Sequence, residues 1–266
     1  MKTISSRQNA FYKRVRHAID EHAEEIAIEG PKAVDDAIAS GWKPLLIVQR
    51  ASVIPTERSE WSDLHRLSGA APSSSLEMTA ELFDSLADTK TSQGVIALFE
   101  RPHFNDIFSN RDRIIVALDG VQDPGNVGTI VRLAAAFDAA GVVLLPGCAD
   151  AYGPKAIRAS VGAILTVPVV SMSREELLAR DWPLFVADGS GKAIDPPSRG
   201  AVIVFGNEGG GVSHEIAECA TKIAIPMTKK VESLNVAASA AILLARSYAL
   251  RSWGRTPSSA RAAKQR

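Results

Sequence analysis

Short apolar segments alternate with helix-like segments along the second half of this 266-residue chain, and no other feature constrains its fold as strongly. Segments typical of buried strands occur at Ile114–Leu118, Val142–Leu145, Leu184–Ala187, Val202–Phe205 and Lys222–Ile225. The sequences between them favour helices, and one of these helices begins with a capping box formed by Ser173 and Glu176. Strands that alternate with helices predict a parallel sheet covered by helices on both faces.

The first part of the chain follows a looser version of the same pattern. A basic helix is expected at Ser6–Ile19, and a second helix should run from Pro31 to Ser40 because proline favours the first turn and Gly41 favours a stop. The remaining elements are expected as strands at Leu45–Gln49 and Gly94–Phe99, a loop at Ser68–Ser75, and a short helix from Thr79 to Leu86.

A polar stretch at Glu100–Arg113 separates the two parts of the chain. We therefore expect an α/β domain over residues 1–100, a linker over 101–112, a second α/β domain over 113–251, and a disordered basic tail over 252–266. The last helix, Leu234–Arg251, is apolar nearly all round. Such a helix should be buried, in part against a second subunit.

The charge distribution leaves a nucleic-acid partner open. The chain has 30 basic and 30 acidic residues, so its net charge is zero. Residues 1–16 and 247–266 nevertheless contain lysine and arginine and no aspartate or glutamate. Basic ends on a neutral body favour contact with phosphates, and solvated termini explain the same pattern equally well.

Other features of the sequence bear on location and on metals. The longest apolar run, Val236–Ala245, is shorter than the roughly 20 residues that cross a bilayer, and no apolar segment follows the N-terminal charges. Cys148, Cys219 and the five histidines lack the spacing of metal ligands. We expect a cytoplasmic protein with reduced thiols that binds neither a membrane nor a metal.

Three loops should lie at the carboxyl ends of the strands, where open α/β sheets bind ligands. The first loop, Asp119–Arg132, places Gly125, Asn126 and Gly128 at the start of a helix, where free N–H groups can meet an anion. Arg132 follows six residues after Asn126. The alternative interpretation is a turn with an asparagine cap and a solvated arginine.

The second loop, Val204–Ser213, is rich in glycine but does not match the dinucleotide pattern, because Glu208 occupies a glycine position. A carboxylate there repels pyrophosphate and suits hydroxyl or amine donors, although a flexible loop with a capping glutamate is the alternative. The third loop, Ile225–Ser239, places Ser233 and Asn235 at the mouth of the last helix. Capping by Ser233 explains that placement too, and it does not exclude contact with a ligand.

Together these loops resemble the three motifs of the SpoU/TrmH family of RNA ribose 2′-O-methyltransferases, in the SPOUT superfamily. The resemblance rests on segments in the family's order: Asn126-x-Gly128-x-x-x-Arg132, Arg158-Ala-Ser-Val-Gly-Ala163, Gly206-Asn-Glu208-Gly-x-Gly211, Ile225-Pro-Met227 and Ser233-Leu-Asn-Val-Ala237. It covers residues 113–251 well. The first domain resembles more loosely a ribosomal-protein-like RNA-binding domain, through Glu29-Gly-Pro-x-x-Val34 and Asp88-Thr-Lys-Thr-Ser-Gln-Gly94.

The resemblance implies a fold and an assembly. The C-terminal SPOUT domain would have a parallel sheet and a trefoil knot that binds S-adenosylmethionine, and the active site would lie at a homodimer interface. Chain physics alone argues against a knot. This sequence also departs from the family pattern at Arg246, where an acidic residue is expected, and at Lys229–Lys230, where glycine is frequent.

The resemblance also implies roles for individual residues. Gly206, Ile225 and Leu234 correspond to backbone positions that hold the cofactor. The catalytic positions correspond to Asn126, Arg132, Glu208, Ser233 and Asn235. The family pattern makes Arg132 the group that abstracts the ribose proton; because arginine is protonated at neutral pH, clamping a phosphate and stabilising the developing alkoxide is an alternative. Glu208 would orient Arg132 or a group of the substrate.

The function that follows is methylation of a ribose 2′-hydroxyl in ribosomal or transfer RNA, with S-adenosylmethionine as the methyl donor. Two other classes remain as alternatives. An RNA-binding module without catalysis is disfavoured because Asn126, Arg132 and Glu208 are all present. A nucleotide-dependent oxidoreductase is disfavoured because no strand is followed by the dinucleotide pattern.

Overall fold

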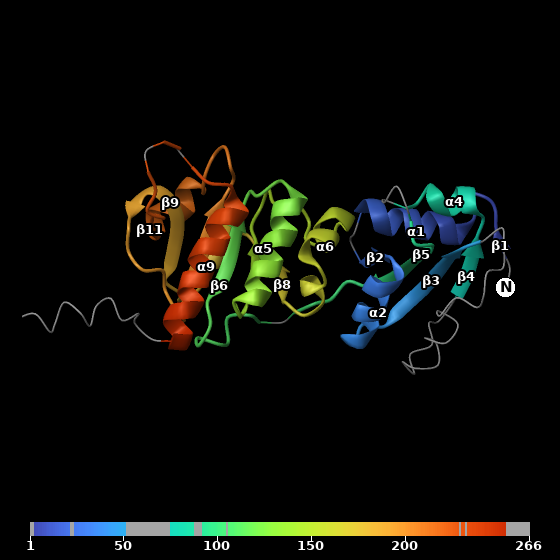
Figure 1. The fold of residues 1–266 in the computed structure, drawn as a ribbon, viewed down its shortest axis with the longest axis horizontal. Coiled ribbons are helices and arrows are strands. Elements are labelled where there is room, and N and C mark those ends of the chain that lie inside the picture. The colour runs from blue at the N-terminus through green and yellow to red at the C-terminus, as the bar shows by residue number, and fades with distance from the viewer. Residues whose placement is uncertain are drawn as a thin grey trace, which may run out of the picture. The chain divides into compact units, whose positions relative to one another are not determined.

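The computed structural model describes residues 3–21, 24–51, 75–87, 92–104, 106–228, 230–231 and 233–253. Two compact units contain these residues (Figure 1). One unit consists of Met1–His103 with Tyr152–Arg158, and the other of Phe104–Ala151 with Ala159–Arg266. Each unit is organised around its own sheet.

The N-terminal unit is built on a mixed five-stranded sheet in the order β1-β4-β3-β5-β2. Strands β1, β4 and β3 are parallel to their neighbours, whereas β5 runs antiparallel to both β3 and β2. The elements are β1 (Thr3–Ile4), α1 (Ala10–Glu21), β2 (Glu25–Glu29), α2 (Pro31–Ala39), β3 (Pro44–Arg50), β4 (Ser75–Met78), α4 (Ala80–Asp84) and β5 (Val95–Glu100).

Helices α1 and α4 share one hydrophobic core with this sheet. Tyr12 and Val15 of α1 and Phe83 of α4 are buried with Leu46 of β3 and Leu98 of β5. Helix α2 contacts β2 and β5 and buries Val34 and Ala37. The unit therefore has the layered α/β form expected for a domain of this size.

The helix expected from Pro31 is confirmed, since α2 has Pro31 in its first turn and Ser40 as its C-cap. The first helix begins later than expected, at Ala10, because the Asn9 side chain accepts a hydrogen bond from the Phe11 N–H and so starts the helix there. The strands β2 and β4 were not predicted. Most of the expected loop at Ser68–Ser75 lies outside the described residues, and Ser75 itself begins β4.

The C-terminal unit contains a six-stranded sheet in the order β11-β9-β10-β6-β7-β8. Every pair of neighbouring strands in it is parallel, so the predicted parallel sheet is confirmed. Its strands are β6 (Ile115–Asp119), β7 (Gly141–Leu144), β8 (Val169–Ser171), β9 (Leu184–Lys192), β10 (Val202–Gly206) and β11 (Thr221–Ile223). The short strand β8 was not predicted.

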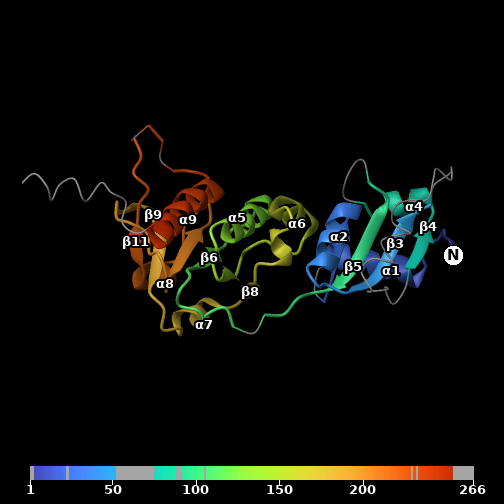
Figure 2. The same cartoon turned by 60° about the horizontal axis from the view of Figure 1, so that its bottom comes forward.

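Helices cover both faces of this sheet. Figure 2 shows α5 and α9 on one side of it and α7 and α8 on the other. On the α7 and α8 side, Leu177 and Ile216 pack against Ile115, Val143 and Val204 of the strands. The helices are α5 (Pro124–Ala136), α6 (Pro154–Ser160), the 3-10 turn η1 (Ala163–Leu165), α7 (Arg174–Leu178), α8 (His214–Cys219) and α9 (Val236–Trp253).

The capping box predicted at the start of α7 is present, with reciprocal hydrogen bonds between Ser173 and Glu176. The described residues of the stretch 101–112 contain no helix or strand. Ile107 and Phe108 of that stretch are nevertheless buried in the core of the C-terminal unit, where Phe108 packs edge-on against Trp182. The end of the polar stretch is thus anchored to this core.

Helix α9 differs from its prediction in two ways. It begins at Val236 and not at Leu234, because Asn235 caps it. It packs against α5 and β10 and buries Val236, Ala240, Leu243 and Leu244, but it is not buried all round: Ile242 is 43% exposed and Trp253 is 79% exposed. The single chain thus buries one side of α9, and burial of the other side against a second subunit stays a prediction.

Candidate active site

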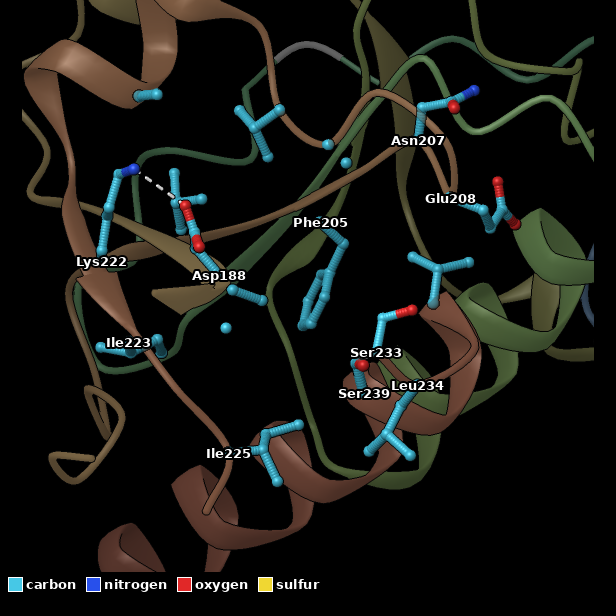
Figure 3. Close-up of a pocket in the computed structure, with 18 of the residues that line it drawn as sticks. Asp188, Phe205, Asn207, Glu208, Lys222, Ile223, Ile225, Ser233, Leu234 and Ser239 are labelled. Atoms are coloured by element: carbon cyan, nitrogen blue, oxygen red, sulfur yellow. Dashed lines mark ion pairs between the residues drawn. The ribbon is translucent and has the colours of Figure 1, made fainter. Parts of the chain in front are cut away.

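A cavity of about 330 Å³ lies at the carboxyl ends of β9 and β10, beside β11 and the start of α9 (Figure 3). This is the edge of a parallel sheet where ligands are expected. Five of the predicted site residues line the cavity, namely Gly206, Glu208, Ile225, Ser233 and Leu234. Its volume falls within the range of about 300–1,000 Å³ that is typical of small-molecule sites.

The glycine-rich loop after β10 is folded tightly around the side chain of Asn207. Its Oδ1 accepts hydrogen bonds from the Gly209 N–H at 2.8 Å and the Gly210 N–H at 3.1 Å, while its Nδ2 donates to the Gly120 carbonyl at 2.8 Å. A side chain at Gly206 would place its Cβ 2.2 Å from the backbone carbon of Gly211. Glycine is therefore required at Gly206, and Asn207 ties this loop to the turn that follows β6.

A buried ion pair holds the end of β6 in place. Asp119 is 2% exposed, and its Oδ1 accepts hydrogen bonds from Arg174 Nε at 3.0 Å and Nη2 at 2.7 Å. Its Oδ2 accepts a hydrogen bond from the Ser213 N–H at 2.8 Å, and the bonds to Asp119 raise the pKa of Arg174. Asp119 thus joins α7 and the loop before α8 to the carboxyl edge of the sheet.

Three predicted catalytic residues form one hydrogen-bonded chain. Asn126 Nδ2 donates to Glu208 Oε1, and Asn126 Oδ1 accepts from Asn235 Nδ2 at 3.2 Å. Each residue comes from a different loop, so the three sequence motifs meet at this point. Because Asn126 both donates and accepts, the positions of the Glu208 carboxylate and the Asn235 amide are set by the same side chain.

The caps of the two helices at the site differ from the simple capping interpretations. Helix α5 is capped by Asp123, whose side chain accepts from the Asn126 N–H, so Asn126 is not the cap. Helix α9 is capped by Asn235, whose Oδ1 accepts from the N–H groups of Ala237 at 2.9 Å and Ala238 at 3.2 Å. Ser233 lines the cavity beside that cap.

Replacing Asn235 with alanine is expected to lower the free energy of unfolding by about 0.5–2 kcal/mol, the usual cost of losing a helix N-cap. Asn235→Asp keeps a capping oxygen but removes the amide that donates to Asn126. Chemical denaturation should therefore find the aspartate variant close to wild type and the alanine variant destabilised. Equal loss in both variants would contradict the capping role.

Arg132 lies apart from the hydrogen-bonded chain. It is exposed on α5, and its guanidinium makes no hydrogen bond or ion pair with the described residues. Six residues of α-helix advance about 9 Å and turn about 240° around the axis, so Arg132 points to a different side of α5 from Asn126. Glu208 accepts a hydrogen bond from Asn126, and within the described part of the chain it forms no hydrogen bond or ion pair with Arg132.

Sequence reasoning missed Asp119, Asn207 and an ion pair in the cavity wall between Asp188 and Lys222, whose Oδ2 and Nζ atoms are 2.9 Å apart. Asp119 and Asp188 directly follow predicted strands, and Asn207 lies two residues beyond one; Lys222 begins a predicted strand. A place at the carboxyl edge of the sheet was therefore the available signal for the first three, and Lys222 had none. Figure 3 shows the Asp188–Lys222 pair across the cavity from Glu208.

Two of the three positions that depart from the family pattern, Arg246 and Lys230, lie within the described residues. Arg246 pairs with Asp195, so its charge is matched within the chain. Lys230 is exposed, and Lys229 lies outside the described residues.

Within the described ranges, no helix is long and apolar enough to cross a bilayer. Within the same ranges, no group of three or more His, Cys, Asp or Glu side chains is arranged to hold a metal ion.

Comparisons with known proteins match both parts of the chain to known families. Residues 113–245 match the SpoU rRNA Methylase family, and residues 16–97 match the MRM3-like substrate binding domain. The 23S rRNA (guanosine(2553)-2′-O)-methyltransferase RlmP of Bacillus subtilis is 30% identical over 92% of this chain and 98% of its own length. The 23S rRNA (adenosine(1067)-2′-O)-methyltransferase of Streptomyces laurentii is 43% identical over 50% of this chain and 53% of its own length.

A solved structure of an rRNA methyltransferase resembles most of this chain. The AdoMet-bound rRNA methyltransferase from Sinorhizobium meliloti aligns with a TM-score of 0.78 and 26% identity, covering 92% of this chain and 97% of its own. The family model covers the strands, the glycine-rich loop and the α9 segment that enclose the cavity. The chain belongs to the SpoU family of rRNA methylases.

Proposed function

We propose that this chain transfers a methyl group from S-adenosylmethionine to the 2′-hydroxyl of a ribose in ribosomal RNA. The observation that carries the proposal is the chain of hydrogen bonds from Asn235 through Asn126 to Glu208 at the edge of the cavity. It joins the residues of all three family motifs around one site. The 23S rRNA methyltransferases among its relatives support ribosomal RNA as the substrate.

The cavity residues fit S-adenosylmethionine. Phe205, Ile225 and Leu234 offer apolar surface for an adenine ring, while Glu208 and Ser233 offer polar groups. We propose that the backbone at Gly206, Ile225 and Leu234 holds the cofactor. Because the loop after β10 is rich in glycine, the cofactor can approach the loop's backbone closely. When bound, the cofactor supplies a methyl group on a positively charged sulfur.

The chain's own residues orient the RNA ribose. Polar side chains at one edge of the sheet would position the substrate relative to the cofactor. They are the amides of Asn126 and Asn235, the carboxylate of Glu208 and the hydroxyl of Ser233. Such positioning removes much of the entropic cost of bringing two reactants together. Arg132 would clamp an RNA phosphate and stabilise the negative charge that develops on the ribose oxygen.

The N-terminal part would bind the RNA. We propose a substrate-binding domain of ribosomal-protein-like fold over residues 1–100, a linker that begins at residue 101 and is anchored to the second core by Ile107 and Phe108, and a methyltransferase domain over 113–251 that α9 extends to Trp253, followed by a basic tail. The match of residues 16–97 to a substrate-binding domain supports this division. On α1, Arg14 pairs with Glu25 and Arg16 with Asp20, so Arg7 and Lys13 are the cations more available to phosphates.

Reversing the charges of Arg7 and Lys13 together, both exposed to solvent, is expected to weaken RNA binding. The slope of log affinity against log salt concentration should fall by about two, because each phosphate contact contributes close to one unit. Filter binding at several salt concentrations measures this slope. The affinity for S-adenosylhomocysteine is the control and should not change; an unaltered salt slope would remove these two cations from the RNA surface.

We also infer a trefoil knot in the C-terminal part of the methyltransferase domain. Two features support it. The loop after β10 and the segment that precedes α9 enclose the same cavity, and α9 then returns to pack on α5 and β10. These segments lie next to one another although β11 and its connections separate them in sequence.

A homodimer is part of the proposal. One side of α9 presents Ala238, Ile242, Ala245, Ala249 and Trp253, which we call the α9 outer stripe; none of the five is buried. Small residues along a helix allow a second helix to approach closely. A second copy of this chain would cover the α9 outer stripe, and Arg132 of one subunit would complete the cavity of the other.

The test is a methylation assay with radiolabelled S-adenosylmethionine and total RNA, followed by mapping of ribose 2′-O-methyl groups. Label in 23S ribosomal RNA is expected. Label only in transfer RNA would redirect the substrate, and RNA binding without label would favour a non-catalytic module. Calorimetry with S-adenosylhomocysteine and NAD separates the remaining alternative, because a response to NAD alone identifies an oxidoreductase. A cytoplasmic site of action is proposed with this function.

A further inference from the structure

The wall of the cavity opposite Glu208 is built from an irregularity in strand β9. Val186 of β9 pairs with Lys222 of β11, and the next pair joins Lys192 to Ile223, so residues 187–191 bulge out between two successive pairs. Ala187, Asp188 and Gly189 of this bulge line the cavity. A side chain at Gly191 would place its Cβ 2.7 Å from the backbone carbon of Lys222, so only glycine lets β11 pass this closely.

The Asp188 carboxylate in the bulge is fixed by several donors. Its Oδ1 accepts hydrogen bonds from the Ser190 N–H and the Ser190 hydroxyl, each at 2.8 Å, and its Oδ2 pairs with Lys222 Nζ at 2.9 Å. The bonds from Lys222 and from the Ser190 backbone lower the pKa of Asp188 from 3.8 to about 2. At neutral pH this group is therefore ionised and acts only as an acceptor.

Asp188 retains capacity for a ligand. An ionised carboxylate has about four lone-pair sites, and the bonds from Ser190 and Lys222 occupy three of them. The side chain is 30% exposed and borders the cavity, so the remaining site is open to a donor there. Lys222 lies against the same carboxylate and repels a second ammonium group, which disfavours the amino group of a methionine moiety as that donor.

The place of Asp188 in the sheet points to a hydroxyl donor. It lies two residues after Val186, where the pairing of β9 with β10 ends, next to β10 and its glycine-rich loop. In parallel α/β sheets, an acidic side chain beside a glycine-rich nucleotide loop commonly accepts hydrogen bonds from ribose hydroxyls. Bonds from a hydroxyl to a carboxylate are also stronger than those between neutral groups.

We propose that Asp188, positioned by Lys222 and Ser190, accepts hydrogen bonds from the ribose hydroxyls of the cofactor's adenosine and selects for them. The proposal rests on the proposed function, since it takes S-adenosylmethionine as the ligand. Asp188 determines cofactor specificity. Lys222 is a positioning residue that holds the Asp188 carboxylate toward the cavity.

The experiment is a calorimetric cycle with two ligands and two proteins. Full-length wild-type protein and Asp188→Ala are titrated with S-adenosylhomocysteine and with its 2′,3′-dideoxy analogue. Wild type should bind the natural ligand about 10- to 100-fold more tightly than the dideoxy analogue, as expected for hydrogen bonds to a charged acceptor. Asp188→Ala should bind both ligands with similar affinity, and it should bind the dideoxy analogue as wild type does.

Each other outcome has a definite meaning. If Asp188→Ala discriminates between the ligands as strongly as wild type, or loses affinity for both equally, Asp188 does not read the hydroxyls and the inference is overturned. An analogue with inosine in place of adenosine tests the base amine: if its loss of affinity disappears in Asp188→Ala, the carboxylate contacts adenine instead. If wild type binds no S-adenosylhomocysteine at all, the proposed function itself fails.

Lys222→Ala provides a second variant that keeps the carboxylate. Asp188 still accepts hydrogen bonds from Ser190 in this variant. The ratio of the affinities for S-adenosylhomocysteine and its dideoxy analogue should therefore lie between the ratios for wild type and Asp188→Ala. Lys222→Arg should restore it, since arginine also donates to a carboxylate. Full discrimination in Lys222→Ala would overturn the positioning role of Lys222.

Discussion

Replacing Arg132 with alanine is expected to lower the rate of methyl transfer by about 10²–10³-fold, the usual loss when a group that stabilises developing negative charge is removed. Arg132 is exposed on α5 and does not line the cavity. The affinity for S-adenosylhomocysteine should therefore change little. Single-turnover methylation of RNA measures the first quantity, and calorimetry measures the second.

Arg199→Ala is the matched control, because Arg199 is also an exposed arginine of the C-terminal unit and lies in the loop between β9 and β10. It should methylate RNA at the wild-type rate. Restoration of activity by Arg132→Lys would favour a simple positive charge over the two-pronged geometry of a guanidinium. Undiminished turnover in Arg132→Ala would end the assignment of Arg132 to catalysis.

The sequence predicts elements well where a local residue sets their limits. Pro31 and Gly41 bracket α2, and Ser173 with Glu176 begins α7, because each of these residues acts on backbone groups within four positions. Apolar runs predict the central strands for the same reason. Elements without such signals were missed, including β8, which is only the three residues Val169–Ser171.

The candidate site could be located from the sequence but its connections could not. The parallel sheet places the three motif loops at one edge, and five of the predicted residues do line one cavity. The bonds that organise the site join Asn126 to Glu208, 82 positions away, and to Asn235, 109 positions away. No local pattern encodes such pairs, since they depend on how the strands are ordered in the sheet.

The ion pair between Asp188 and Lys222 in the cavity wall also could not be predicted from the sequence. Its position depends on the register shift between β9 and β11, which inserts residues 187–191 into the edge of the cavity. The sequence Asp-Gly-Ser-Gly at 188–191 reads as an ordinary turn. Only the pairing of Lys192 with Ile223 shows that β9 resumes beyond it.

If the proposed homodimer forms through α9, replacing Ile242 with glutamate is expected to dissociate it and to reduce methyl transfer to near background. Ile242 lies at the centre of the α9 outer stripe and is 43% exposed, so a charge there is tolerated in a single chain. In a dimer the same charge would be buried without a partner, which costs several kcal/mol. Light scattering measures the mass of the particle, and circular dichroism checks that the helix is retained.

Ile194→Glu is the control for an added surface charge, since Ile194 is 39% exposed and is not a member of the α9 outer stripe but lies in the loop after β9. It should remain dimeric and active. A dimeric and active Ile242→Glu would show that the subunits meet elsewhere, whereas an active monomer of wild type would rule out a shared site altogether.

Glu208→Ala should also be inactive, because Glu208 is proposed to position the substrate and cofactor. Mixing it with Arg132→Ala then tests whether each site draws on both subunits. If Arg132 of one subunit serves the cavity of the other, a heterodimer of Arg132→Ala and Glu208→Ala contains one site with both changes and one intact site. Random co-assembly makes about half of the dimers mixed, so about a quarter of wild-type activity should return. If Arg132 serves its own cavity, every site in the mixture carries one defect and no activity returns.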